Sequence, residues 1–284
     1  MTATVRSRDE LIAELRALGV HAGGVLLVHT AFRAVRPVDG GPEGLIAALS
    51  AALGPDGTLV MPCWSGDDEA VFDPAASEPA EDLGVLPRVF RRLPGVLRSP
   101  HPFAFAARGP EAARIVDTGL PLPPHGPDSP VDRVRQADGQ VLLLGIGHEA
   151  DTTLHLAEVL AGVGYRVAHH VTVAEGGHAV RIDYGETDHC CRRFALADDW
   201  LRGRGLQREG RVGNAAARLV RARDVVAVAQ ERLRVEPDIF LHGPGEGCLD
   251  CDLARAGKGQ DWAPHRTPLG RLSALSGDAR FPVT

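Results

Sequence analysis

The sequence predicts an α/β protein built on a largely parallel sheet, and three stretches carry this prediction. Residues 25–29 and 58–61 are apolar runs of strand length, separated by a helical pattern over 42–53. A strand, helix and strand at this spacing form a unit whose strands run parallel, with a right-handed crossover. A third apolar run, 141–146, leads through glycines into the helical pattern 152–163. Such a run is typical of a buried parallel strand.

The first helix begins at a recognisable cap. Ser7 and Glu10 have the spacing of a capping box, in which each side chain satisfies the other's backbone N–H. Leucines at positions 11, 15 and 18 then share one face, and Gly19 ends the pattern.

The remaining elements are predicted from periodicity. Residues 75–125 are rich in proline and irregular, and the stiff loop 121–127 carries His125. Segments 167–173 and 179–184 alternate and predict a hairpin. Further helices are expected over 85–93, from about 197, near 215–222 and over 224–233.

Length and composition indicate an ordinary soluble protein. The chain has 284 residues, 44% of them hydrophobic, and we expect one domain over 1–256 followed by a poorly ordered, dispensable tail over 257–284. Its N-terminus has no apolar h-region, so we expect no secretory leader, and no apolar run is long enough to cross a membrane. Five cysteines give no even disulfide framework, so we expect a reducing cytoplasm.

Charge and missing motifs exclude several functions. The net charge of -6 argues against nucleic acid or an anionic membrane as partner and is compatible with a cationic ligand. The sequence has no Walker loop, no dinucleotide-binding glycine motif before a helix and no Gly-x-Ser-x-Gly elbow. Nucleotide hydrolysis, nicotinamide redox chemistry and serine hydrolysis are therefore not expected.

The helix after residue 151 carries a candidate catalytic base. Asp151 can cap this helix, and His155 lies in its first turns with Glu158 three residues further on. Open α/β sheets bind ligands at this edge, and the helix dipole there favours a neutral imidazole. The alternative is a histidine that is only a surface or core residue.

An acidic group of side chains suggests a ligand with amines. Carboxylates hold ammonium groups, and a nearby imidazole, His125 or His155, can accept an amine proton. Each acid alone is equally consistent with a solvated surface. The acidic residues are Asp67, Asp68, Glu69, Asp183, Glu186 and Asp188.

The cysteines suggest a structural metal. Cys190 and Cys191 with the Cys248-x-x-Cys251 knuckle have the donor types of a tetrahedral zinc site, and reduced thiols are the alternative. Adjacent cysteines on one ion are unusual, so His189 is an alternative to either of the pair. A redox role for the Cys-x-x-Cys knuckle is less favoured, because no thioredoxin-like βαβ unit precedes it. A catalytic zinc site is not favoured, because its candidate ligands contain no helical i, i+4 pair. Those candidates are His148, His155, His169 and His170.

Five segments taken together resemble the aminoglycoside 3-N-acetyltransferases. They are residues 26–37, 57–62, 98–103, 152–158 and 188–191. The resemblance extends in order to about Ala256 and is closest to the type IV branch, which acts on apramycin. It implies a three-layer α/β/α fold with a central mixed, largely parallel sheet, unrelated to the Gcn5-type acetyltransferases. A zinc-stapled C-terminal helical segment is expected beside it.

The resemblance also implies a reaction. Acetyl would pass from acetyl-CoA to the 3-amino group of a 2-deoxystreptamine aminoglycoside, which confers antibiotic resistance. His155 would be the general base and Glu186 would hold its ring. We expect backbone N–H groups near Thr30 and Ala31, or the hydroxyl of Thr30 or Thr153, to stabilise the tetrahedral oxyanion.

The same resemblance assigns the binding residues. Those expected to bind coenzyme A are Thr30, Ala31, Phe32, Arg33, Val35, His101 and Phe103. Those expected to line the drug pocket are Asp68, His125, Glu186 and Asp188, with Trp64 as a wall. This chain has Asp67 next to Asp68, and the sequence does not decide which of them faces the drug.

Two other functions are compatible with the residues: acetylation of a different amine, and zinc-stabilised sequestration of cationic drugs without chemistry. The sequence leaves open the range of aminoglycosides and the choice between acquired resistance and self-protection of a producer. It also leaves the oligomeric state open, and a homodimer is compatible with it.

Overall fold

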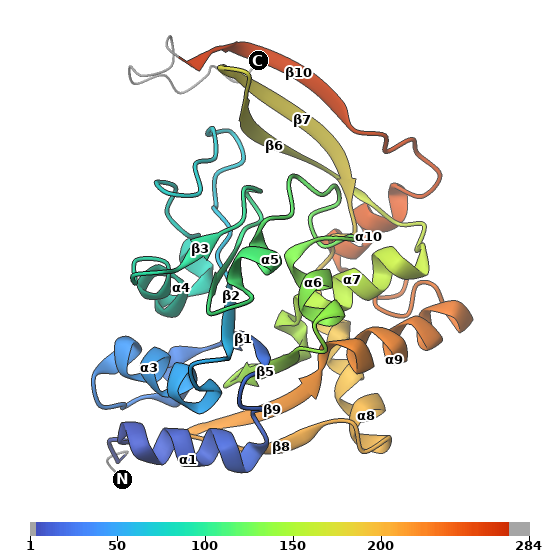
Figure 1. Ribbon diagram of the computed structural model, residues 1–284. Coiled ribbons are helices and arrows are strands. Elements are labelled where there is room, and N and C mark those ends of the chain that lie inside the picture. The colour runs from blue at the N-terminus through green and yellow to red at the C-terminus, as the bar shows by residue number, and fades with distance from the viewer. Residues whose placement is uncertain (1–3, 273–284) are drawn as a thin grey trace.

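The larger of two sheets forms the centre of the molecule (Figure 1). The computed structural model describes residues 4–272. Across the sheet the strands are β3 (Leu97–Arg98), β4 (Phe105–Arg108), β2 (Thr58–Pro62), β1 (Val25–Thr30), β5 (Gln140–Leu144), β9 (Ala215–Arg221) and β8 (Arg208–Val212).

The pairing makes this sheet mixed. β1 runs parallel to β2 and to β5, which confirms the predicted strand–helix–strand unit. The other pairs, β2–β4, β3–β4, β5–β9 and β8–β9, are antiparallel. The expectation of a largely parallel sheet is therefore wrong, because each edge is a directly connected antiparallel pair, β3–β4 or β8–β9, whose inner strand also runs antiparallel to β2 or β5.

Helices cover both faces and enclose a separate core on each. On one face lie α1 (Arg8–Leu18), α3 (Gly41–Leu53) and α4 (Val85–Phe90). On the other lie α5 (Ala112–Val116), α6 (Pro130–Gln136), α7 (Thr152–Ala161), α8 (Leu196–Gly203) and α9 (Ala222–Val235). The expected three layers are present. The remaining helical segments are α2 (Phe32–Val35), η1 (Glu81–Leu83), η2 (His148–Ala150), η3 (Arg192–Ala195) and α10 (Leu249–Ala256).

The predicted helix caps are confirmed. The Ser7 hydroxyl accepts from the Glu10 backbone N–H at 3.3 Å, and the Glu10 carboxylate accepts from the Ser7 N–H at 2.7 Å. The Asp151 carboxylate accepts from the Thr153 N–H at 3.0 Å. These caps satisfy N–H groups that the first helical turn leaves without partners.

One predicted helix is a strand. Residues 215–222 are rich in alanine, yet 215–221 form β9 against β5. Ala215, Ala217 and Leu219 alternate onto one buried face, and pairing with a central strand outweighs helix propensity. Strands β3 and β4, in the segment expected to be irregular, were also not predicted.

The smaller sheet has the order β10–β7–β6 and stands at the upper end of the molecule in Figure 1. β6 (Val167–Glu175) and β7 (His178–Glu186) form the predicted hairpin. β10 (His265–Arg271) pairs antiparallel with β7. The prediction of a poorly ordered tail is wrong for these residues, because the free edge of β7 gives them backbone partners. Residues 273–284 of that prediction lie outside the described chain.

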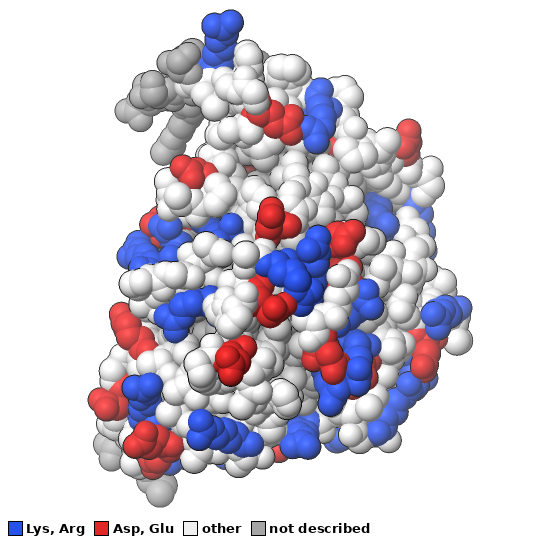
Figure 2. Space-filling model, in the orientation of Figure 1, with Lys and Arg blue, Asp and Glu red and all other residues white. Residues whose placement is uncertain are grey.

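The surface carries mixed charge. On the face drawn in Figure 2, acidic and basic side chains lie next to one another over the large sheet and its helices. Among the described residues, no helix is long and apolar enough to cross a membrane.

Replacing Leu143, which is fully buried in β5, tests the sheet core. We expect Leu143→Ala to lower the free energy of unfolding by about 2–5 kcal/mol, because it leaves a cavity between strand and helices. Val235→Ala, at a position 86% exposed, is the control and should change it by less than about 0.5 kcal/mol. Urea unfolding measures both, and equal effects would contradict the assigned core.

Candidate functional site

A cavity of about 460 Å³ opens at the carboxyl ends of β1, β2 and β5. Its floor includes Thr30 and Pro62, the last residues of β1 and β2, and Ile146, just beyond β5. The start of α7 forms one wall and brings His155 into the cavity. The expected placement of the histidine at this edge of the sheet is confirmed.

His155 is held by a carboxylate of its own helix. Its Nδ1 lies 2.9 Å from Oε2 of Glu158, which is fully buried. A carboxylate only accepts hydrogen bonds, so it places the ring proton on Nδ1 and leaves Nε2 as an acceptor. The Glu158 carboxylate therefore fixes the orientation of the His155 ring.

Glu158 has two further donors. His189 Nε2 lies 2.8 Å from Oε1, and the Tyr165 hydroxyl donates to the same oxygen. Burial alone would raise the pKa of Glu158, but the charge of His189 and the hydrogen bonds from both histidines lower it to about 2. Glu158 is thus a buried carboxylate with a fixed position.

Glu186 does not hold the His155 ring, contrary to the sequence-based expectation. Its Oε1 accepts from the Thr187 N–H at 3.1 Å, and its Oε2 has no partner among the described residues. Burial raises the pKa of Glu186 to about 7. The spacing of three residues in one helix brings Glu158 to the ring instead. That spacing was visible in the sequence and was assigned no role.

The pKa of His155 also differs from the expectation that the helix dipole favours a neutral imidazole. Burial would lower the pKa of His155, but the Cys191 sulfur and Glu158 raise it well above its usual value. Cys191 Sγ lies 3.4 Å from His155 Nε2. Local contacts therefore stabilise the protonated ring more than the helix position alone would, and Nε2 is an acceptor only while the ring is neutral.

His125 lies against His155. The ring centroids are 5.4 Å apart at 24°, and both side chains line the cavity. Neither His125 ring nitrogen has a partner among the described residues, and burial lowers its pKa well below the usual value. It is a neutral imidazole with free nitrogens at the site.

The residues expected to bind coenzyme A are only partly at the cavity. Thr30 and Phe103 line it. His101 is buried, and its Nδ1 accepts from the Phe103 N–H at 2.9 Å. Arg33 is exposed outside the lining, and the side chain of Val35 is fully buried in the core. Phe32 packs against the same core from α2.

Only some of the groups expected to stabilise the oxyanion are free to donate a hydrogen bond. The Ala31 N–H donates to the Leu144 carbonyl at 3.0 Å and is therefore already used by the sheet. The hydroxyls of Thr30 and Thr153 are buried and have no partner among the described residues. They remain as donors.

The expected drug-binding residues divide into two groups. Trp64, His125 and Asp188 line the cavity. Asp188 is fixed by His169 Nε2 at 3.0 Å, and this hydrogen bond lowers its pKa although burial opposes the shift. Asp68 is half-buried near His169 and His170, and burial raises its pKa.

Asp67 turns away from these groups. It is exposed, and its Oδ1 accepts from the backbone N–H groups of Glu69 and Ala70 at 3.1 and 3.0 Å. This local turn uses the carboxylate within its own loop. Of the two neighbouring acids, Asp68 has the more enclosed position.

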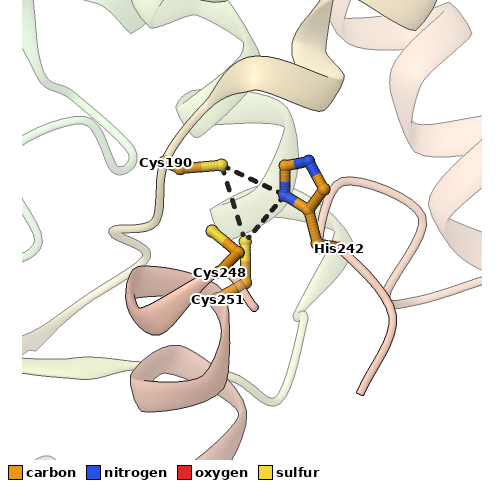
Figure 3. A group of neighbouring side chains, drawn as sticks. All are labelled: Cys190, His242, Cys248 and Cys251. Atoms are coloured by element: carbon orange, nitrogen blue, oxygen red, sulfur yellow. Dashed lines mark hydrogen bonds between the residues drawn. The ribbon is translucent and has the colours of Figure 1, made fainter. Parts of the chain in front are cut away.

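A second group of side chains has the donor types of a metal site. Cys190, His242, Cys248 and Cys251 bring one atom each within 4.8 Å of one another, and Figure 3 shows their sulfur and nitrogen atoms facing a common centre. His242 Nδ1 lies 3.3 Å from Cys190 Sγ and 3.5 Å from Cys251 Sγ. The two sulfurs are 3.6 Å apart.

This group differs from the predicted set. Cys191 has a left-handed backbone, with φ of 56°, and its sulfur points to His155 instead. His189 replaces neither cysteine, because it bonds to Glu158. His242 was missed. It comes six positions before Cys248, and a search for histidines near the knuckle would have found it.

The four histidines of the disfavoured catalytic zinc site are not grouped in the described chain. His148 lies between Asp151 and Gln207 at 2.9 and 2.8 Å, whereas His169 lies with Asp188. His170 Nε2 is 2.9 Å from Glu69.

Known proteins match this fold over most of its length. Residues 27–234 fit the family model for aminoglycoside 3-N-acetyltransferases. Aminoglycoside N(3)-acetyltransferase IV of Salmonella sp is 61% identical over 240 residues, 84% of this chain and 92% of the relative. The crystal structure of the apoenzyme AAC(3)-IVa has 59% identity and a TM-score of 0.89, covering 90% of this chain and 99% of that one.

Related structures contain ligands. A histidine-to-alanine mutant of AAC(3)-IVa was solved with apramycin, at 56% identity and a TM-score of 0.83, covering 88% of this chain and 100% of that one. AAC-IIIb was solved with CoASH, at 29% identity and a TM-score of 0.74, covering 82% and 97%.

The fold, the histidine–carboxylate pair and these matches define an acetyltransferase that modifies antibiotics. The chain belongs to the aminoglycoside 3-N-acetyltransferase family, and it is an aminoglycoside N(3)-acetyltransferase.

The buried Glu158 predicts a pH-dependent effect on stability. Because its folded pKa of about 2 lies below the ordinary 4.5, the charged form contributes about 3 kcal/mol at pH 7. This contribution is complete above the unfolded pKa and falls as the pH drops towards the folded pKa. Glu158→Gln should therefore destabilise strongly at pH 7 and by roughly half as much near pH 3. Urea unfolding of both proteins measures the difference, and a difference that does not change with pH would contradict the assignment.

Proposed function

We propose that the cavity binds an aminoglycoside beside acetyl-CoA and that His155 removes the proton from the 3-amino group. The observation that carries this proposal is the His155–Glu158 pair, whose Nδ1–Oε2 contact of 2.9 Å leaves Nε2 beside Cys191, which also lines the cavity. Apramycin is the substrate we propose first, because a 56% identical structure contains it.

The proposed reaction steps follow from the tautomer of His155 that carries its proton on Nδ1. The amine nitrogen attacks the thioester carbonyl, and His155 Nε2 takes the proton that the amine loses. Glu158 stabilises the imidazolium that forms. When the carbon–sulfur bond breaks, the imidazolium can return its proton to the departing thiolate.

The tetrahedral intermediate needs hydrogen-bond donors. We assign this role to the free hydroxyl of Thr30, which lines the cavity, because the Ala31 N–H is occupied. Buried donors that need not reorganise during the reaction are effective at stabilising an oxyanion.

The acidic side chains suit an aminoglycoside. Asp188 lines the cavity, and Asp68 and Glu186 stand near it on the side of the smaller sheet. Carboxylates in a partly enclosed site bind ammonium groups through charge-assisted hydrogen bonds. We propose that Asp68 and not Asp67 serves the drug, since the Asp67 carboxylate caps its own turn.

Release of free CoA thiol from acetyl-CoA tests the reaction and its base. We expect release on adding apramycin, and we would test gentamicin and neomycin beside it. His155→Ala should lower kcat about 10²–10⁴-fold, as loss of a general base does. Glu158→Gln should also lower kcat, because the ring loses its orienting carboxylate. His178→Ala, in the exposed hairpin, is the matched control and should leave the rate unchanged.

Two results would contradict the proposal. Full activity of His155→Ala would remove the assigned base. Release with simple diamines but with no aminoglycoside would point to a different amine as the substrate.

We also propose that Cys190, His242, Cys248 and Cys251 hold a structural zinc ion. Ligands 2.3 Å from a tetrahedral zinc place their sulfurs about 3.8 Å apart, and the measured separation of Cys190 and Cys251 is 3.6 Å. With three thiolates and one imidazole, all four positions are filled by protein. The ion would be structural and would take no part in the reaction.

Such an ion would act at a distance on the base. Cys190 lies between His189, which bonds to Glu158, and Cys191, which contacts His155. Fixing Cys190 to α10 and to His242 would therefore hold the turn that orients the catalytic pair.

Metal analysis of protein purified without chelator tests this site. We expect about one zinc per chain in the wild type and in Cys191→Ser, and loss of zinc in His242→Ala and Cys251→Ser. Loss in Cys191→Ser with retention in His242→Ala would favour the set predicted from sequence. No zinc in the wild type would leave the cluster as reduced thiols.

We assign residues 1–256 and strand β10 to one domain, because β10 completes the smaller sheet. The five cysteines are free thiols. Free thiols are typical of cytoplasmic proteins, and we propose the cytoplasm as the location.

A further inference from the structure

The loop over residues 63–80 carries two groups of the proposed drug site. It leaves the end of β2 and reaches the smaller sheet (Figure 1). Trp64 lines the cavity, and Asp68 is the carboxylate that we assign to the drug. The loop closes on itself, because the Ala80 N–H donates to the Trp64 carbonyl at 2.8 Å. The positions of Trp64 and Asp68 therefore depend on how this loop is held.

Arg98, the last residue of β3, contacts the loop at several points. Its Nε donates to the Cys63 carbonyl at 2.9 Å, and its Nη2 donates to the same oxygen. Its Nη1 donates to the Ser77 carbonyl and lies 3.5 Å from the Pro74 carbonyl oxygen. The Arg98 Cζ also lies 4.7 Å from the centroid of the Phe72 ring, within the range of a cation–π interaction. One guanidinium therefore contacts the start, the middle and the last part of the loop.

These contacts use the planar fork of an arginine. A guanidinium has five N–H donors in a fixed plane and can serve carbonyl groups that approach from different directions. The ammonium of a lysine is a single charged point on a flexible stem. Within the described chain, every hydrogen bond that Arg98 donates goes to a backbone carbonyl of residues 63–77. The proposed acetyl transfer gives this side chain no task, so its contacts serve the loop.

The loop has a separate attachment to β6. The Phe72 N–H donates to the Thr172 carbonyl at 3.0 Å, and the Thr172 hydroxyl donates to the Asp68 carbonyl at 2.8 Å. Neither bond involves Arg98. When the guanidinium is removed, we therefore expect the loop to loosen and not to detach.

We propose that Arg98 is a positioning residue for the aminoglycoside, which keeps the 63–80 loop in the arrangement in which Trp64 and Asp68 contact the drug. This inference rests on the proposed function of the cavity. Without the guanidinium, only a fraction of the molecules has the loop in the binding arrangement, and the apparent affinity for the drug falls by that fraction. The proposed base, His155, belongs to α7 and makes none of these contacts, so the bound complex still reacts.

Steady-state kinetics of Arg98→Met with apramycin and acetyl-CoA test the inference. We expect the KM for apramycin to rise roughly tenfold or more, as it would if about a tenth of the molecules had the binding arrangement. The KM for acetyl-CoA and kcat should stay within about twofold of the wild type, because only drug binding is weakened. A merely structural role would lower the amount of active enzyme, and with it kcat, and would leave both KM values unchanged.

Two further measurements separate positioning from general damage. Arg98→Lys should restore part of the affinity for apramycin, because an ammonium can reach one of the Cys63 and Ser77 carbonyls but not both. Hydrogen exchange reads the loop without any substrate. Peptides covering residues 63–80 should exchange faster in Arg98→Met than in the wild type, because the loop opens more often.

Arg108→Met is the matched control. Arg108 lies in the neighbouring strand β4, donates to the Ser50 hydroxyl at 2.7 Å and has its Cζ 5.9 Å from the centroid of the Phe90 ring. Its replacement removes the same side chain and similar contacts, but none with the loop. Both KM values and the exchange of residues 63–80 should match the wild type.

The inference is overturned if Arg98→Met has the wild-type KM for apramycin, or if residues 63–80 exchange at the wild-type rate in this variant. It is also overturned if Arg108→Met raises the KM for apramycin as much. If the wild type turns over no aminoglycoside, the proposed function fails and this inference fails with it, whereas normal wild-type turnover with an unaltered Arg98→Met overturns this inference alone. Should Arg98→Met fail to fold, Arg98→Lys decides by the same comparison.

Discussion

The buried carboxylate of Glu158 is the interaction on which the site depends. A fully buried charge is costly unless it is paired and hydrogen-bonded, and Glu158 has donors from His155, His189 and Tyr165. These donors come from α7, from the turn after β7 and from the connection to β6. One carboxylate therefore joins three segments and fixes the ring of His155, and the site keeps its geometry because that charge must stay satisfied.

The turn at residues 189–191 shows how closely structure and chemistry are coupled in this protein. Three successive side chains point in three directions: His189 to Glu158, Cys190 to the cluster with His242, and Cys191 to His155. The backbone at Cys191 is left-handed. A metal that holds Cys190 would act on the base through its neighbours in the chain, without approaching the substrate.

The sequence predicted the site where local spacing or a motif carried the information. The strand–helix unit, the Asp151 cap and the position of His155 at the carboxyl edge of the sheet are all confirmed. Predictions that needed long-range contacts were less successful. The partner of His155 is Glu158 and not Glu186, His242 takes the cluster position expected for Cys191, and Val35 lies in the core. Each of these errors concerns where a side chain points after the chain has folded.

By itself, the sequence determined the helix caps, the parallel pair β1 and β2, the hairpin of β6 and β7 and the family. Each of these depends on residues that are close in the chain or on the order of short motifs along it. The tertiary structure decided that residues 215–221 form a strand, that β10 completes the smaller sheet, and which donors surround Glu158. The physical reason is that strand pairing and the satisfaction of a buried charge depend on partners far away in sequence, and local propensity does not contain them.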